Sequence, residues 1–249
     1  MGQLDLRTAV VTGGSSGIGL ATAQRFADEG AHVYITGRRG PELAAAAAKI
    51  GGRVTTVRAD TAEIADIDRL METVEAAGDR IDVLFANAGG GSFRALEDVT
   101  PQHFDQIFAA NVRGLLFTVQ KALPLMSRGS SIILNGSTAA FTGTPTFGVY
   151  GASKAAVHSL GRVWSNELAP RGIRVNVLAP GLIETPGLLA DAGSDEGART
   201  ELRTTLSEFV PLGRLGEVDE AADAALFLAH AGFVTGAELV VDGGESRRR

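Results

Sequence analysis

Tyr150 and Lys154 are the residues whose types and spacing first suggest chemistry, in the run Tyr150-Gly151-Ala152-Ser153-Lys154. If this segment is helical, the phenol and the ammonium lie on one face, one turn apart. A nearby ammonium favours the phenolate, so Lys154 is expected to lower a tyrosine pKa that is ~10 when unperturbed. A tyrosine tuned in this way can act as a general acid or base near neutral pH. The pair alone also fits an exposed tyrosine beside a solvated lysine, so the surrounding elements must decide.

Short apolar runs alternate with longer helical patterns along the whole chain. Strands are expected at 8–12, 32–36, 53–57, 81–86, 131–135, 173–178 and 238–242, and helices at 18–29, 43–50, 64–76, 101–126, 149–168 and 218–229. Repeated strand–helix–strand units with continuous apolar strands indicate a parallel sheet with helices on both faces. Because no linker or change of composition divides the chain, residues 1–249 are expected to form one doubly wound, seven-stranded α/β domain.

Composition is that of an ordinary globular protein, with 45% hydrophobic and 21% charged residues in 249. A formal net charge of −6 argues against a nucleic-acid partner. The N-terminus lacks a signal-peptide pattern, and no apolar run approaches the ~18 residues of a membrane span. Cysteine is absent and the four histidines are scattered, so neither a disulfide nor a metal site is expected. We expect a cytoplasmic protein, with the basic tail 246–249 solvated rather than an anchor.

A glycine-rich turn follows the first expected strand. Between a strand and a helix, glycines permit a tight turn and a close approach to a pyrophosphate, while the helix N-terminus supplies free N–H groups and partial positive charge. A plain strand-to-helix connection is the alternative, but the position at the start of a strand–helix–strand unit favours a nucleotide site. The residues expected to bind a dinucleotide here are Gly13, Ser15, Ser16, Gly17, Ile18 and Gly19.

The second expected strand ends in Thr36-Gly37-Arg38-Arg39-Gly40. Many dinucleotide sites carry an Asp or Glu here, to bind the ribose 2′-OH. This segment has no acid, and its two guanidinium groups suit a 2′-phosphate. The sequence therefore favours NADP(H) over NAD(H). Arg38 is the stronger candidate because it lies nearer the strand, and the alternative is that one or both arginines are merely solvated.

Four motifs, taken in order along the chain, resemble those of the short-chain dehydrogenase/reductase family, whose one-domain members have ~250 residues. They are the spacing Gly13-x3-Gly17-x-Gly19, the run Ala86-Asn87-Ala88-Gly89 with Ala86 in place of the first Asn of N-N-A-G, the segment Pro180-Gly181-Leu182-Ile183-Glu184-Thr185, and the Tyr150/Lys154 pair with Ser137 and Asn111 before it. The resemblance covers nearly the whole chain. It implies a single-domain Rossmann fold and hydride exchange between a nicotinamide cofactor and a C–O centre.

The resemblance also implies a catalytic tetrad. Tyr150 would give a proton to the carbonyl oxygen in reduction or take one from the alcohol in oxidation. Ser137 would hydrogen-bond that oxygen, and Lys154 would lower the Tyr150 pKa and hold the nicotinamide ribose. Asn111 would support a water that links Lys154 to solvent. The plainer alternatives are that Asn111 satisfies backbone groups in an irregular helix and that Ser137 caps or terminates the strand.

Further cofactor contacts are implied by the same resemblance. Asp60 and Thr61 would flank the adenine, although Asp60 also reads as a polar strand end. The adenosine ribose and the pyrophosphate would lie against Asn87, Ala88 and Gly89. The nicotinamide end would lie beside Tyr150, Lys154, Pro180, Gly181, Ile183 and Thr185.

Substrate identity is not readable from the sequence. Phe141, Phe147 and Leu182 are candidates for an apolar pocket and equally for the core. Residues 186–212 are expected to form a mobile lid. A ketone or aldehyde/alcohol pair is the implied substrate, and 3-oxoacyl-acyl-carrier-protein reductase is one candidate activity. The resemblance implies a homotetramer or homodimer, and a non-catalytic NADP(H)-binding sensor of the same fold is the alternative function.

Overall fold

Seven strands form one sheet in the computed structural model, which describes residues 2–247. They are β1 (Thr8–Val11), β2 (His32–Gly37), β3 (Val54–Arg58), β4 (Ile81–Ala86), β5 (Met126–Asn135), β6 (Arg174–Pro180) and β7 (Glu238–Val241). Every neighbouring pair runs parallel, in the order β3-β2-β1-β4-β5-β6-β7. The predicted doubly wound fold with a seven-stranded parallel sheet is therefore confirmed.

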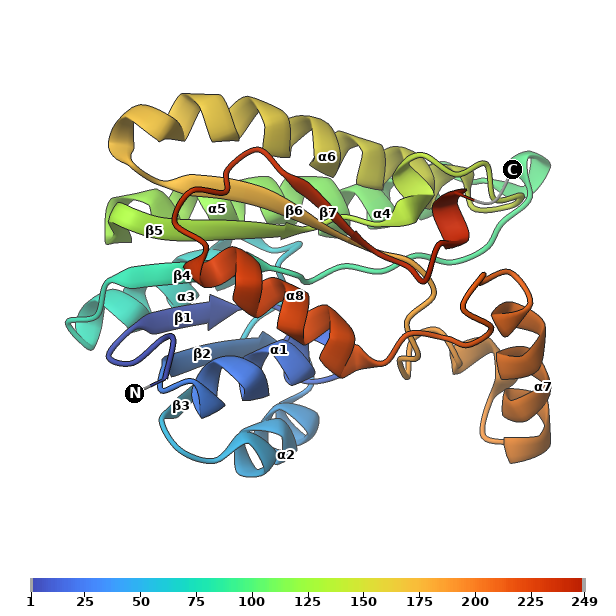
Figure 1. Cartoon of the computed structure of the whole chain (residues 1–249), viewed down its shortest axis with the longest axis horizontal. Helices are drawn as coiled ribbons and strands as arrows, with labels where there is room; N and C mark the ends of the chain where they lie inside the picture. Colours follow the sequence, from blue (N-terminus) through green and yellow to red (C-terminus); the bar gives the residue numbers. More distant parts are fainter. Residues whose placement is uncertain (1, 248–249) are drawn as a thin grey trace.

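Helices cover both faces of this sheet (Figure 1). They are α1 (Gly17–Asp28), α2 (Gly40–Ile50), α3 (Ile64–Ala76), α4 (Pro101–Phe108), α5 (Leu115–Ala122), α6 (Gly148–Leu168), α7 (Glu196–Ser207) and α8 (Val218–His230). Successive strand residues point to opposite faces, so Ile132 packs in one core cluster with α3, α5 and α6, and Ile133 in the other with α1, α2 and α8. Strands buried on both sides account for the unbroken apolar runs in the sequence.

The carboxyl ends of the strands meet at one edge, and the chain reverses its direction of travel across the sheet between β1 and β4. β1 lies between β2 and β4, and its residue Val11 pairs with Ile35 on one side and Phe85 on the other. Open parallel sheets bind ligands at the carboxyl edge beside such a switch point. The turns that follow these strands therefore carry the candidate site.

The single helix expected over 101–126 is wrong in its details. After α4 comes a π-helical segment, Ala109–Gly114, then α5 and a 3₁₀ turn, Leu123–Leu125, and β5 begins already at Met126. A Cβ at Gly114 would collide with the main-chain oxygen of Thr61, so glycine lets the helix pass close to that turn. Pro124 then prevents the helix from reaching 126, because proline offers no N–H donor.

The segment 186–212 contains a helix that the sequence did not predict. α7 is capped by the Asp195 carboxylate, which accepts a hydrogen bond from the Ala198 N–H at 2.9 Å. None of its residues is buried, and its few apolar residues, Ala198, Leu202 and Leu206, give a weaker signal than the apolar stripes of the buried helices. Figure 1 shows α7 standing apart from the helices that flank the sheet.

Two further points concern membrane-spanning helices and the basic tail. Within residues 2–247, no helix is long and apolar enough to cross a membrane. Of the basic tail, 248–249 lie outside the described residues.

Candidate functional site

A cavity of about 460 Å³ opens at the carboxyl edge of the sheet, beside the switch point. Most of the residues predicted to bind a dinucleotide line it: Gly13, Ser15, Ser16, Gly17, Ile18, Gly19, Arg38, Arg39, Asp60, Thr61, Asn87, Ala88, Gly89 and Thr185. These residues follow five different strands, β1 to β4 and β6. The fold therefore gathers into one cavity what the sequence spreads over most of its length.

The glycine-rich turn has the conformation and clearance that a phosphate cradle requires. Gly13 and Gly17 have φ values of +67° and +54°, a region that side chains disfavour. A Cβ at Gly19 would collide with the main-chain oxygen of Gly13 and approach Asn87 Nδ2 to 2.5 Å. At the start of α1, the N-cap Ser16 makes no side-chain capping bond within the described structure. The helix N–H groups and partial positive charge thus face the cavity, which fits a pyrophosphate.

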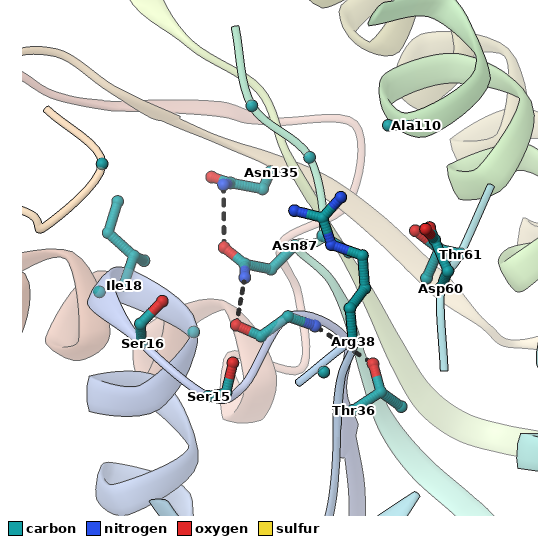
Figure 2. Close-up of a pocket in the computed structure, with 18 of the residues that line it drawn as sticks. Ser15, Ser16, Ile18, Thr36, Arg38, Asp60, Thr61, Asn87, Ala110 and Asn135 are labelled. Atoms are coloured by element: carbon teal, nitrogen blue, oxygen red, sulfur yellow. Dashed lines mark hydrogen bonds between the residues drawn. The ribbon is translucent and has the colours of Figure 1, made fainter. Parts of the chain in front are cut away.

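Side-chain hydrogen bonds lock the turns after β1, β4 and β5 together. Thr12 Oγ1 accepts bonds from the N–H groups of Asn87 and Ala88, each at 3.0 Å. Asn87 Nδ2 donates to the main-chain oxygens of Thr12 and Gly13, and Asn135 Nδ2 donates to Asn87 Oδ1 at 2.9 Å. Figure 2 shows the chain of bonds from Asn135 through Asn87 to the glycine-rich turn, where the Gly13 N–H donates to Thr36. The cavity floor is consequently held in place by the protein itself.

The two arginines after β2 differ in their surroundings. Arg39 pairs with Glu42 at 3.1 Å, whereas Arg38 forms no ion pair within residues 2–247. Figure 2 shows the Arg38 side chain extending from the end of β2 across the cavity. Asp60 lines the cavity, as a residue that flanks an adenine would. It also accepts the Ala62 N–H at 3.0 Å, as a polar residue at a strand end would.

Sequence reasoning missed several lining residues: Thr36, Gly37, Ala59, Gly90, Gln106, Ile107, Ala110, Asn135, Pro186 and Gly187. Gln106, Ile107 and Ala110 lie on one face of the α4 region, and their spacing alone did not distinguish them from residues facing solvent or the core. Asn135 carried a better signal, because a polar residue ends the buried run of β5 next to Ser137.

Tyr150 lies near the start of α6, between the Phe147 ring and the main chain at Gly91. The Phe147 ring stacks on it with centroids 4.3 Å apart, and Phe93 stacks on Phe147 at 4.4 Å. A Cβ at Gly91 would meet the Tyr150 ring, so the 89–93 loop closes on the phenol from another side. Burial raises the pKa of Tyr150, and a hydrogen bond with Ser137 opposes this rise.

Lys154 is buried one turn along α6. Its Nζ donates to the main-chain oxygen of Asn135 at 2.7 Å and lies 5.6 Å from the centroid of the Tyr150 ring. Burial lowers the Lys154 pKa to about 8, so the amine is still mostly protonated at pH 7. The expected net lowering of the Tyr150 pKa is wrong for this structure, because burial of the phenol dominates and raises that pKa.

Asn111 lies in the π-helical segment with its amide fully engaged. Its Oδ1 accepts the Gly90 N–H, and its Nδ2 donates to the Gly90 oxygen and to Ser153 Oγ, each at 2.9 Å. Ser153 in turn donates to the Tyr150 main-chain oxygen at 2.7 Å. The Asn111 side chain thus ties the 89–93 loop to α6, as the plainer of its two interpretations expects. Its part in a proton relay stays a prediction.

The other predicted residues lie around this centre rather than in the cavity. Pro180 and Ile183 are buried, and Gly181 donates to the Val241 main-chain oxygen. Among the substrate candidates, Phe147 alone stacks on Tyr150, whereas Phe141 is half exposed and meets His158 edge-on. Leu182 accepts the Gly216 N–H, a bond that helps pair 182–184 with 216 at the base of the lid.

Comparison with known proteins agrees with this architecture. A family profile described as enoyl-(acyl carrier protein) reductase matches residues 13–246. The chain is 43% identical over 246 residues to "Oxidoreductase asL5" of Sarocladium schorii, which covers 97% of this chain and 96% of that protein. It is 35% identical over 251 residues to an NADP-dependent (R)-specific alcohol dehydrogenase of Lentilactobacillus kefiri, with 97% of each covered.

Solved structures give the same answer. A short-chain dehydrogenase/reductase of the glucose/ribitol dehydrogenase type from Brucella melitensis has a TM-score of 0.90 and 32% identity, covering 98% of this chain and 99% of its own. These proteins resemble this chain over nearly its whole length, and the family motifs of this chain lie together at the carboxyl edge of its sheet. This chain is therefore an oxidoreductase of the short-chain dehydrogenase/reductase family.

Proposed function

We propose that this protein is an NADP-dependent oxidoreductase that interconverts a ketone or aldehyde with an alcohol. The observation that carries the proposal is that Asn135, at the end of β5, contacts both the cavity and Lys154. Asn135 lines the glycine-cradled cavity with its side chain, and its main-chain oxygen accepts the hydrogen bond from Lys154 Nζ. A dinucleotide in the cavity would thus end beside Lys154, and Tyr150 stands one turn away.

Residues that follow the first four strands, together with Thr185, would bind the cofactor. Gly13 to Gly19 would hold the pyrophosphate, and Asp60 and Thr61 would flank the adenine. Lys154 would hold the nicotinamide ribose. The bound cofactor supplies the hydride, and the protein supplies orientation and charge.

Tyr150 would exchange the proton with the substrate oxygen. Its raised pKa keeps the phenol protonated near neutral pH, the form that a carbonyl reduction needs. Ser137 would hydrogen-bond the same oxygen, and its bond with Tyr150 supports their acting at one point. Asn111 would hold the 89–93 loop against α6 around that point.

Preference for NADP(H) rests on Arg38. Its guanidinium is unpaired within the described residues and reaches across the cavity, while the segment after β2 has no acid to bind a 2′-OH. The Lentilactobacillus kefiri relative, described as NADP-dependent, supports the same preference.

The substrate site and the assembly are further parts of the proposal. Residues 186–212, with α7, would form the lid over Tyr150, with Phe147 and Leu182 near its base. A 3-oxoacyl chain remains one candidate substrate among ketones. A homotetramer or homodimer in the cytoplasm is what the family resemblance implies for this chain.

The test is NADPH oxidation with a panel of ketones by wild type and Tyr150→Phe. We expect turnover with at least one ketone, and a loss of about a thousandfold in the variant, in line with general acid catalysis. Tyr34→Phe is the matched control, because Tyr34 is the other tyrosine of the chain and its hydroxyl bonds Asp79 away from the cavity. Equal turnover in wild type and Tyr150→Phe would refute the role of Tyr150. NADPH binding without turnover of any ketone would favour the non-catalytic sensor.

A further inference from the structure

A buried histidine lies directly behind Ser137. His158, two turns along α6 from Tyr150, is 3% exposed, and its Nε2 accepts the main-chain N–H of Ser137 at 3.4 Å. On the other side of the ring, Nδ1 lies 2.9 Å from Glu238 Oε2 on β7. Glu238 is held in turn by Arg162 Nη1 at 2.5 Å. A chain of polar contacts thus runs from the surface of α6 to the main chain of Ser137.

These contacts determine which ring nitrogen carries the proton. A main-chain N–H can only donate, so Nε2 must be unprotonated. The proton is then on Nδ1, which donates to the Glu238 carboxylate. Burial alone would raise the Glu238 pKa, but His158 and Arg162 outweigh it and hold that pKa below its usual value. A neutral imidazole oriented by an ionised carboxylate is the arrangement that proteins use to orient a histidine.

The backbone before Ser137 is shaped for this ring. A Cβ at Gly136 would collide with His158 Nε2, so glycine gives the imidazole access to the main chain. The next residue is held as well, because Thr138 Oγ1 donates to Glu245 Oε2 at 2.9 Å. Both carboxylates come from the end of the chain, Glu238 from β7 and Glu245 from the 3₁₀ turn after it.

We propose that His158, oriented by Glu238, is a positioning residue that sets the place of Ser137 opposite Tyr150. The role rests on the proposed function, since it concerns the group that would hold the substrate oxygen. Releasing the Ser137 N–H would let the turn at 137–140 shift. A displacement of about 1 Å at such a group costs on the order of a hundredfold in rate.

Two substitutions separate positioning from simple packing. His158→Leu removes both hydrogen bonds and should lower kcat with a ketone by about ten- to hundredfold, while the NADPH Kd stays within about twofold. His158→Gln retains one acceptor for Ser137 and one donor for Glu238. It should therefore restore kcat to within about threefold of wild type.

His32→Gln is the matched control. His32 also lies between a carboxylate, Asp79 at 2.9 Å, and a second polar partner, Thr55, but at the start of β2, away from the cavity. It should leave kcat as in wild type. Thermal melting of each variant reports whether it is folded.

The possible results distinguish failure of the His158 role from failure of the proposed function. A folded His158→Leu with wild-type kcat, or a His158→Gln with kcat as low as the leucine variant, overturns the role of His158 alone. If His158→Leu does not fold, His158→Gln decides, and a folded glutamine variant with kcat more than about tenfold below wild type overturns the proposal. Wild-type turnover that survives Tyr150→Phe overturns both this role and the proposed function.

Discussion

The two sides of the candidate site are built differently. The cofactor side, from β1 to β4, is a cavity with glycines at 13, 17 and 19 and a floor locked by Thr12 and Asn87. The catalytic side, from β5 to β7 with α6 and the 109–114 segment, consists of side chains enclosed by neighbours. Lys154 is 3% exposed and Asn111 is 1% exposed.

Cofactor binding and catalysis therefore depend on different physical properties of the site. The cofactor side needs clearance, so adding atoms there should harm affinity. The catalytic side needs polar groups held out of water, which costs stability. Changes on one side should therefore leave the function of the other nearly intact, and the predictions below test that separation.

The largest effect on cofactor affinity is expected for an added methyl group in the cradle. In Gly19→Ala the Cβ would collide with the Gly13 oxygen, so the turn must open, and the NADPH Kd should rise by about ten- to hundredfold. Gly40→Ala is the control, because a Cβ there meets nothing within 4 Å. Titration with NADPH measures both, and equal affinity in the two variants would contradict a phosphate cradle at Gly19.

On the catalytic side, Lys154→Met should raise stability while it removes turnover. Burial lowers the Lys154 pKa from 10.5 to about 8. The unfolded chain thus binds the proton more tightly, and the cost of charging the buried amine is fully present below pH 8. Allowing for the lost bond to Asn135, the variant should be more stable at pH 7 by about 2 kcal/mol.

The pH dependence of that gain checks its cause. As pH rises from 8 to 10.5, the unfolded lysine loses its proton too, so the difference in unfolding free energy between Lys154→Met and wild type should shrink. Urea unfolding at pH 7 and at about pH 10 measures it. A difference that stays constant with pH would show that repacking, and not the buried charge, is responsible.

A smaller effect is expected for the choice of cofactor. Arg38→Asp should reduce the preference for NADPH over NADH by about tenfold, since a carboxylate repels the 2′-phosphate and accepts a 2′-OH. Arg39→Asp should change the preference much less, because Glu42 already engages that guanidinium. Kd values for both cofactors give the ratio, and an unchanged ratio in Arg38→Asp would refute the assignment.

The smallest effect concerns the proposed lid. Arg203 joins α7 to its base through Glu184 at 2.9 Å and pairs with Glu196 at 2.8 Å. Such exposed ion pairs each contribute up to about 1 kcal/mol. Arg203→Met should therefore raise the ketone KM by about two- to threefold and leave the NADPH Kd unchanged. A change confined to the NADPH Kd would place α7 with the cofactor side instead.

The sequence predicts the cofactor side better than the catalytic side, and for a physical reason. Strand periodicity and glycine spacing are local signals, and parallel strands bring their carboxyl ends to one edge. From these alone the fold and most of the cavity lining follow. Arg38 and Asp60 could be placed because each follows directly on a strand.

What the sequence missed depends on contacts between distant segments. The raised pKa of Tyr150 comes from enclosure by Phe147 and the 89–93 loop, which no spacing reveals. In the sequence His158 is one of four scattered histidines, and the fold places it behind Ser137. α7 has few apolar residues and buries none of them, so its sequence resembles a polar loop.

One measurement tests the separation of the two sides most directly: titration with NADPH of Tyr150→Phe and Gly19→Ala, followed by turnover at saturating NADPH. The account predicts that Tyr150→Phe binds NADPH as wild type does and does not oxidise it with a ketone. It predicts that Gly19→Ala binds NADPH weakly and retains most of the wild-type turnover once saturated. Loss of affinity in Tyr150→Phe, together with loss of saturated turnover in Gly19→Ala, would contradict it.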